Sequence, residues 1–296
     1  MTDSTTHAPT ASAPPKPVSP GRQAWRMFRQ NHAAMLGLGI ILVIVLVSVF
    51  GPYIYTVAPR DMVWMPLTPP GQSDYLLGTD YLGRDVLAGL INGGRVTITV
   101  GLAAALLTVL IGVTIGALAG YFGGAIDNIL MRVTEFFQVL PNLLFAMVVV
   151  MLFGASLTNI AIAIGIVSWT STARLTRGEF MRLRDAEFVK AERAIGAGNA
   201  RLIWAVILPN AAPPLIVVAA LSIGTAILFE AGLSFLGLTD ANTVSWGRMI
   251  GDNRPYILDG AWGVTFPGIC IFLTVLAISL IGDGLNDAFN PKLRQR

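Results

Sequence analysis

The sequence predicts an all-α membrane protein with six transmembrane helices and both termini in the cytoplasm. Of its 296 residues 54% are hydrophobic and only 12% charged, whereas soluble domains carry about 25% charged residues. Six apolar stretches are long enough to cross a hydrocarbon core about 30 Å thick as helices. This composition excludes a disordered chain and an ordinary cytosolic enzyme.

A polar segment precedes the first apolar stretch. Residues 1–24 are expected to form a disordered cytoplasmic tail, because Thr, Ser, Ala and Pro dominate its beginning and cannot bury a core. The tail lacks the basic region and short apolar core of a cleavable signal peptide. Residues 25–296 are expected to form one transmembrane domain.

The apolar stretches define the expected spans. They lie at about 33–55, 96–121, 131–153, 159–174, 213–238 and 262–285. Continuous runs favour helices over a barrel, since each helix satisfies its own backbone polar groups. With the N-terminus inside, 15 Lys and Arg fall on the cytoplasmic side and five outside. That bias supports this orientation.

Two spans carry packing signals. Gly112, Gly116 and Gly120 recur every four residues in the second span, a pattern that lets helix backbones approach closely. Pro141 is expected to kink or interrupt the third span. Gln138 and Asn142 flank it, and this polar patch either lines a pathway near the inner mouth or joins neighbouring helices.

Few side chains are suited to chemistry. Cys270 is the single cysteine, and both histidines (His7 and His32) precede the first span, so no metal site is expected. No lysine follows a glycine, which excludes an ATP-binding P-loop. Glu230 is the only carboxylate expected deep in the membrane, where it either pairs with a neighbouring helix or gates a path. The basic residues follow the topology, so nucleic acid is not an expected partner.

The loop between the fourth and fifth spans, about 177–210, is the most informative cytoplasmic segment. A first short helix is predicted there, with one apolar stripe formed by Phe188, Ala191 and Ile195. Glycines at 196 and 198 break it, and Asn199 is expected to cap a second helix over 200–207 that ends at Leu208-Pro209. The pair either lies on lipid headgroups or docks on a partner.

The same loop resembles the coupling-loop motif of ABC importer permeases. That motif reads Glu-Ala-Ala, three residues, Gly, nine residues, Ile, one residue, Leu-Pro. Gly196, Val206 and Leu208-Pro209 match it. The opening triplet reads Lys190-Ala191-Glu192, so only its alanine matches and the role of the family's glutamate does not pass to Lys190.

Further stretches resemble the dipeptide/oligopeptide/nickel branch of these permeases, and within it the second, C-type subunit. They lie at 77–87, 120–124, 140–141, 173–178, 229–238, 245–247, 266–268 and 282–285. Their order matches the branch from about Trp25 to Leu293, which leaves only the two ends of the chain outside the resemblance.

The resemblance implies a non-catalytic permease subunit of an ATP-driven importer in a bacterial or archaeal inner membrane. Such a subunit forms half of the translocation pathway for peptides. Its partners would be a second permease, two ATP-binding subunits that use ATP-Mg, an extracytoplasmic substrate-binding protein and membrane lipid. The chain itself would bind no cofactor. Nickel or glutathione as cargo, and an ion-coupled secondary transporter of a different class, are the alternatives.

The resemblance also implies two contact surfaces. Docking on an ATPase is expected at Glu187, Phe188, Lys190, Ala191, Ala194, Ile195, Gly196 and Ala197. Contact with the binding protein is expected at Asp80, Arg84, Asp85 and Trp246. From their spacing alone, Asp80 and Arg84 are expected to form an i,i+4 ion pair at the start of a short helix, and Trp246 is alternatively a tryptophan of the membrane interface.

Overall fold

The computed structural model describes residues 20–72 and 74–289, which fold into helices joined by loops. The helices are α1 (Pro20–Gln30), α2 (His32–Ile54), α3 (Val86–Phe122), α4 (Gly124–Val139), α5 (Asn142–Phe153), α6 (Leu157–Arg184), α7 (Glu187–Ala194), α8 (Asn199–Arg201), the π-helical η1 (Leu202–Ile207), α9 (Leu208–Phe235), α10 (Trp246–Asn253), the 3-10 turn η2 (Arg254–Tyr256) and α11 (Trp262–Phe289). The described part contains no strand, which confirms the all-α class.

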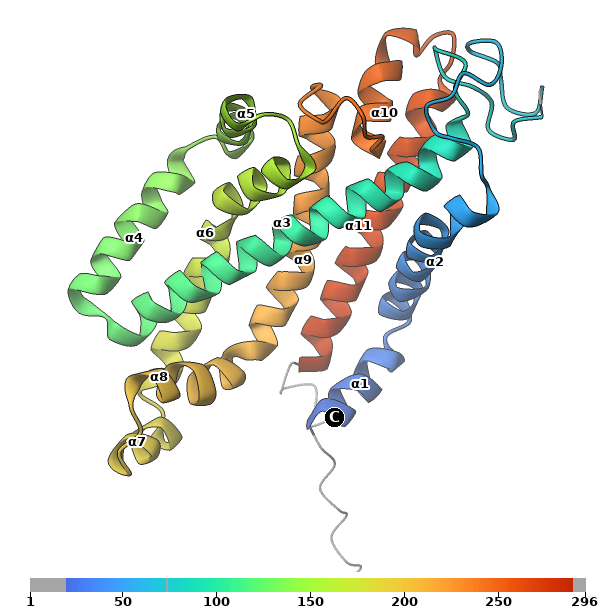
Figure 1. Ribbon diagram of the computed structural model, residues 1–296. Coiled ribbons are helices and arrows are strands. Elements are labelled where there is room, and N and C mark those ends of the chain that lie inside the picture. The colour runs from blue at the N-terminus through green and yellow to red at the C-terminus, as the bar shows by residue number, and fades with distance from the viewer. Residues whose placement is uncertain (1–19, 73, 290–296) are drawn as a thin grey trace, which may run out of the picture.

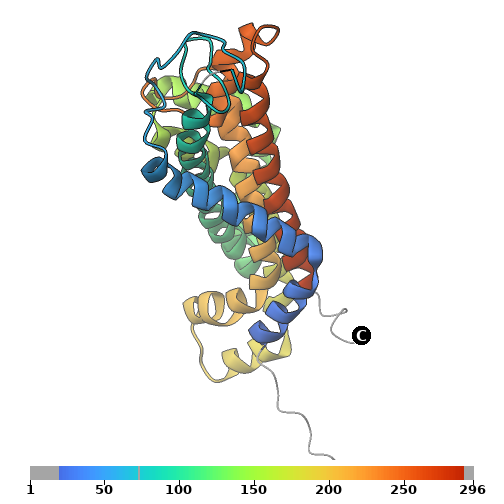
Figure 2. The same cartoon turned by 90° about the vertical axis from the view of Figure 1, so that its right-hand side faces the viewer.

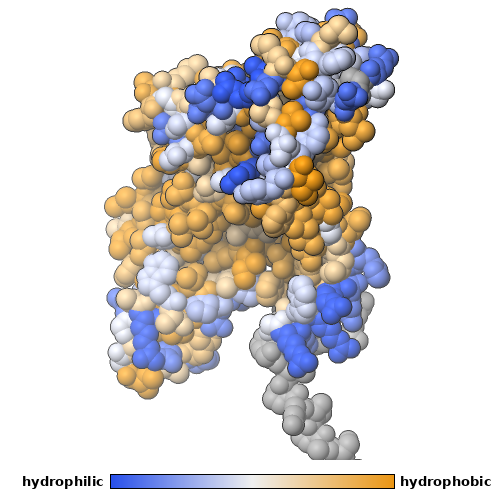
Figure 3. All heavy atoms as spheres, turned by 45° about the vertical axis from the view of Figure 1, so that its right-hand side comes forward, coloured by the Kyte–Doolittle hydropathy of each residue, from blue (hydrophilic) through white to orange (hydrophobic). Residues whose placement is uncertain are grey.

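The long helices run between two ends of the molecule (Figure 1). α1, α7, α8 and the end of α11 lie at one end, called here the α7 end. The loop after α2 and helix α10 lie at the other, the α10 end, and Figure 2 agrees. α3 packs along α6 and α9, while α11 packs against α2 and α9. A broad hydrophobic band separates the hydrophilic side chains of the two ends (Figure 3).

Within residues 20–72 and 74–289, four helices are long and apolar enough to cross a membrane: α2, α3, α11 and the continuous helix Asn199–Phe235. The α4–α5 pair, bent by 89° at its break, makes up to five. This break confirms the interruption expected at Pro141. α6, which contains the expected fourth span, is not among these helices. Its buried face carries Thr170, Thr172 and Thr176, its second half carries four arginines, and these polar side chains together lower its hydropathy.

The glycines of α3 explain how α6 can pack so closely. A Cβ added at Gly116 would lie 2.3 Å from the carbonyl oxygen of Ala173, and one at Gly120 would lie 2.6 Å from that of Arg177. Both distances are far inside van der Waals contact. The close approach predicted from the four-residue glycine spacing is therefore confirmed, and α6 is the helix that approaches.

Several expected boundaries shift. The expected tail lies outside the described residues up to 19, but residues 20–24 already belong to α1, because Ala24 and Phe28 pack in a cluster with Ala34 and Ala288. The second span begins at Val86 rather than near 96. The expected stop at Leu208-Pro209 is wrong. The helix continues through Pro209, where the π-helical turn η1 passes directly into α9.

Candidate functional site

Helix α7 projects from the α7 end of the bundle, and its two faces differ. Val189 is fully buried in a cluster with Leu183 of α6 and Leu202 of η1. On the other side Phe188 is 40% exposed and Ile195 77% exposed. The apolar stripe predicted for this helix therefore points away from the bundle. A short helix that buries one valine and exposes larger apolar side chains presents a surface suited to a partner.

The turn after α7 has a defined geometry. Gly196 has φ +91°, which favours glycine. Its N–H donates to the carbonyl oxygen of Arg193, and the N–H of Ala197 donates to that of Glu192, both at 3.0 Å. These two bonds form a Schellman motif, which ends the helix and satisfies its last carbonyls. An ion pair of 3.5 Å between Arg201 and Glu192 spans the same turn.

Asn199 does not cap the second helix as expected. Gly198 is the N-cap residue, and Asn199 is the first residue of α8. Its side-chain oxygen instead accepts a hydrogen bond of 2.7 Å from the hydroxyl of Tyr121 at the end of α3. The loop is therefore attached to α3 by this bond as well as to α6 and α9 through the chain.

The eight residues expected to dock on an ATPase lie together at the α7 end. Only Ala197 is partly buried, and the others are exposed. Glu187 and Lys190 form an exposed ion pair of 2.9 Å. The eight residues thus form one continuous accessible surface, which we call the docking helix surface.

At the α10 end, Asp80 and Arg84 lie in a turn rather than at the start of a helix. Oδ1 of Asp80 accepts hydrogen bonds of 2.8 Å from the backbone N–H groups of Leu82 and Arg84. Burial raises the pKa of Asp80 above its usual value. In the part of the chain that the structure describes, Asp80 and Arg84 form no ion pair, because the carboxylate is occupied by backbone N–H groups. That expectation was wrong.

Asp85 begins helix α3. As N-cap its side chain accepts a hydrogen bond of 2.9 Å from the N–H of Leu87, and it also accepts one from the hydroxyl of Tyr55. It is 1% exposed. Because these two bonds and its burial occupy the carboxylate, Asp85 is not available as a surface contact.

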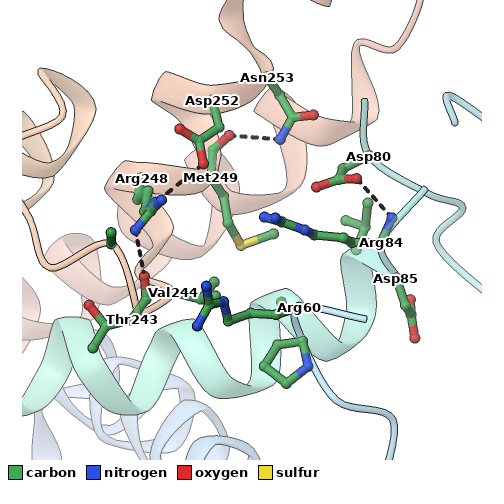
Figure 4. Close-up of a pocket in the computed structure, with 14 residues that line it drawn as sticks. Arg60, Asp80, Arg84, Asp85, Thr243, Val244, Arg248, Met249, Asp252 and Asn253 are labelled. Carbon is green, nitrogen blue, oxygen red and sulfur yellow. Dashed lines mark hydrogen bonds and ion pairs between the residues drawn. The ribbon is translucent and has the colours of Figure 1, made fainter. Parts of the chain in front are cut away.

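A polar pocket lies between this turn and α10 (Figure 4). Arg248 donates to Asp252 at 3.3 Å and to the carbonyl oxygen of Thr243 at 3.2 Å. Arg60 and Arg84 extend into the same space, and Nε of Arg84 is buried with no hydrogen-bond partner among the described residues. The pocket therefore presents guanidinium groups whose hydrogen bonding is incomplete.

Trp246 is neither a surface contact nor an interface tryptophan. It is 2% exposed, and its indole N–H donates a bond of 2.8 Å to the carbonyl oxygen of Leu90. A Cβ added at Gly94 would lie 2.7 Å from its ring. α10 is pressed into the groove beside α3, and its first residue becomes part of the core. Of the four expected outer contacts, Asp80, Arg84 and Asp85 line the pocket, and the carboxylate of Asp85 is already occupied by Leu87 and Tyr55.

The expected pathway residues separate. The amide oxygen of Gln138 accepts a bond of 2.8 Å from Arg174, so this side chain joins α4 to α6. Asn142 begins α5 at the break and is partly buried. Glu230 is 1% exposed and accepts a bond of 2.6 Å from Ser234. The hydroxyls of Thr97 and Ser245 lie beside the same carboxylate, which is therefore enclosed between α3, α9 and the start of α10.

The sequence reasoning missed an ion pair between α4 and α6. Nε and Nη2 of Arg177 donate to the two carboxylate oxygens of Asp127 at 2.5 and 2.6 Å. Gln138 with Arg174 forms a second contact between the same helices. A signal was present, because Asp127 precedes the third expected span and Arg177 follows the fourth. Adjacent antiparallel spans bring such positions to the same level.

Comparisons with known proteins agree with this picture. Residues 112–295 match the family described as "Binding-protein-dependent transport system inner membrane component", and residues 19–70 match the "N-terminal TM domain of oligopeptide transport permease C". The chain is 42% identical to the di/tripeptide transport system permease protein DppC of Pseudomonas aeruginosa, over 93% of each chain. It is 37% identical to the oligopeptide transport system permease protein OppC of Bacillus subtilis, over 95% of this chain and 92% of the relative.

The fold is similar to a solved chain of the MetNI methionine ABC transporter in an inward-facing conformation. The TM-score is 0.56 at 18% sequence identity, and the match covers 66% of this chain and 93% of that one. The helical bundle thus shares its fold with that chain. The chain belongs to the family of binding-protein-dependent transport system inner membrane components, and it is a multi-pass permease subunit of an ABC importer in the bacterial inner membrane.

Proposed function

We propose that this chain forms half of the translocation pathway of an ATP-driven importer of dipeptides and oligopeptides. A second permease supplies the other half, two ATP-binding subunits hydrolyse ATP-Mg, and an extracytoplasmic binding protein delivers the peptide. The chain itself makes no covalent bond. The cargo is inferred from relatives named as di/tripeptide, dipeptide and oligopeptide permeases.

The proposed topology has six spans with both ends in the cytoplasm. The bent α4–α5 pair is the third span and α6 is the fourth. α6 extends from the α10 end to the α7 end (Figure 1), and its polar residues pack inward against α3. A helix shielded by protein tolerates hydroxyl groups that a lipid-exposed helix does not. The Lys and Arg bias supports the cytoplasmic placement of the α7 end.

The docking helix surface carries the mechanism. Phe188 and Ile195 point outward, so a groove on an ATPase can cover them. The loop then continues without a break into the 37-residue helix Asn199–Phe235. A displacement of α7 is therefore passed to α9 through the short hydrogen-bonded turn at 195–198 and then through a continuous helix. Binding energy released when the ATPases close on nucleotide shifts the bundle between two states.

The proposal also assigns roles to residues of the pocket at the α10 end and of the bundle interior. Asp80 and Arg84 border the pocket at the α10 end and contact the binding protein there. Asn142 borders the pathway at the α4–α5 break. Glu230 acts as a positioning residue that fixes α10 on α3 and α9, since its carboxylate faces hydroxyl groups of those elements.

Reconstitution of the assembled transporter in vesicles tests the proposal. Uptake of a labelled dipeptide should require ATP, the binding protein and both permeases, and unlabelled peptide should compete more strongly than nickel or glutathione. Uptake by the purified chain alone, driven by an ion gradient without ATP, would show a secondary transporter instead.

A further inference from the structure

A groove with an apolar lining lies between α1 and the ends of α2 and α11. Trp25 and Phe28 of α1, Leu38 of α2, and Leu285 and Phe289 of α11 line it. The rings of Trp25 and Phe28 stack with their centroids 5.8 Å apart, yet Trp25 is 54% exposed and Phe28 is buried. An exposed tryptophan thus forms one wall of a groove that is open among the described residues.

Three arginines lie on the exposed side of the same helix. Arg22, Arg26 and Arg29 are spaced by four and three residues, which places them on one face of α1. All three are exposed. Among the described residues no carboxylate lies within ion-pair distance of their guanidinium groups. The apolar groove therefore lies beside three positive charges that the described chain does not neutralise.

The groove lies where the hydrophobic band meets the hydrophilic α7 end. α1 leads directly into α2, whose exposed Leu36, Leu42 and Val43 belong to an apolar span, and the band ends toward this end of the molecule (Figure 3). In a bilayer this level is the boundary between acyl chains and headgroups. Amphipathic helices with Arg on one face and Trp beside it bind anionic lipid at that boundary.

We propose that this groove is a binding site for an anionic phospholipid. An acyl chain lies along Trp25 and Leu285, and the phosphate is bound by Arg22, Arg26 and Arg29. Guanidinium groups suit this ligand, because they donate paired hydrogen bonds to phosphate oxygens. The bound lipid holds α1 against the ends of α2 and α11. The site depends on the membrane location of the chain and not on its cargo.

Fluorescence quenching tests the site in the full chain. The protein is reconstituted in phosphatidylcholine vesicles that contain a small fraction of phosphatidylglycerol, with brominated acyl chains on one lipid or the other. The difference between the wild type and Trp25→Phe isolates the signal of Trp25. Brominated phosphatidylglycerol should quench this signal with a preference of about a hundredfold over brominated phosphatidylcholine, since each of the three arginines near an anionic headgroup contributes about fivefold.

Two triple variants separate a site from general charge attraction. R22Q/R26Q/R29Q should abolish the preference, whereas R182Q/R193Q/R201Q, which removes three exposed arginines from the same end, should keep it. Equal quenching by both lipids, or equal loss in both triple variants, would overturn the proposal. Absence of quenching by either lipid would also overturn it, because no acyl chain then lies beside Trp25.

Discussion

Gly196 shows how one residue shapes the docking helix surface. Its φ of +91° lies in the region that favours glycine, and a Cβ there would meet nothing within 4 Å. From the sequence, a side chain at this position is expected to obstruct either the turn between the two helices or their close approach to a partner. Within the chain, glycine is favoured at position 196 by its backbone dihedral and not by a lack of space. A side chain there could clash only with a partner.

Gly196→Glu should leave the chain inserted in the membrane but uncouple ATP hydrolysis from uptake. The left-handed φ costs a non-glycine residue about 1–2 kcal/mol, and the added side chain projects into the docking helix surface. Gly198→Glu is the matched control, since Gly198 also has open space but an ordinary φ of −72°. Transport and ATPase rates of the two variants should be compared. Normal coupled uptake in Gly196→Glu would contradict the account of this turn.

The sequence predicts that Glu230 lies deep in the membrane, but it does not predict which neighbours enclose its side chain. Its burial depends on α10, which folds back onto α3 and α9 from a loop that carries no periodic signal. The same packing hides Trp246, which the sequence alone presents as an interface residue. Position in the sequence shows depth in the membrane, whereas only the packing shows which neighbour encloses a side chain.

Glu230→Gln should retain most of the transport activity, because the amide can still accept the hydrogen bond from Ser234. Glu230→Leu should lower it strongly, since it leaves the buried hydroxyls of Ser234 and its neighbours without an acceptor, at a cost of about 1–3 kcal/mol each. Uptake rates and thermal stability in detergent distinguish the variants. Equal loss in both variants would show that the charge itself is needed.

At the scale of elements, periodicity predicts the long apolar helices well and polar interior helices poorly. The first and last spans agree with α2 and α11 within a few residues. α6 is harder to predict as a span, because its Thr side chains lower its hydropathy but pack against the glycines of α3. This packing involves two helices, so the hydropathy of one helix alone does not reveal it. The α4–α5 break was predictable because proline acts locally.

Gly116→Ala should destabilise the α3–α6 pair. The added methyl group would lie 2.3 Å from the carbonyl oxygen of Ala173, and overpacking of this kind costs about 1–3 kcal/mol. Gly39→Ala is the matched control in α2, because nothing lies within 4 Å of a Cβ there. The thermal unfolding midpoint in detergent should fall for Gly116→Ala only. Equal midpoints would contradict the close contact.

The Asp127–Arg177 pair should couple α4 to α6. In a double-mutant cycle with Asp127→Asn and Arg177→Gln, the coupling energy should be about 1 kcal/mol, since both side chains are partly accessible. The Arg132–Glu135 pair within α4 is the control, because both of its side chains are mostly exposed and its coupling should be close to zero. Thermal stability gives the four free energies in each cycle. Equal coupling energies in the two pairs would contradict a specific role of the Asp127–Arg177 pair in joining α4 to α6.

At the scale of the whole molecule, the family and its general task were evident from motifs distributed over the chain. The sequence did not show how the loop at about 177–210 contacts the helices of the bundle. Asn199 bonds to Tyr121 and not to the start of its own helix, and the loop continues into α9 without a stop. These contacts join residues far apart in the sequence, and they attach the segment after α7 to α3 and α9.

The central claim is that α7 transmits the conformational change of a separate ATPase. Site-specific crosslinking tests it most directly, with Ile195→Cys in a Cys270→Ser background of the assembled, active transporter. Leu258→Cys is the control, because Leu258 is at least as exposed as Ile195 (96% against 77%) and lies in the loop between η2 and α11, far along the chain from α7. We predict a crosslink between Ile195→Cys and an ATP-binding subunit that changes in yield with nucleotide, and none from Leu258→Cys. Active uptake without any crosslink from Ile195→Cys to an ATP-binding subunit would contradict the account.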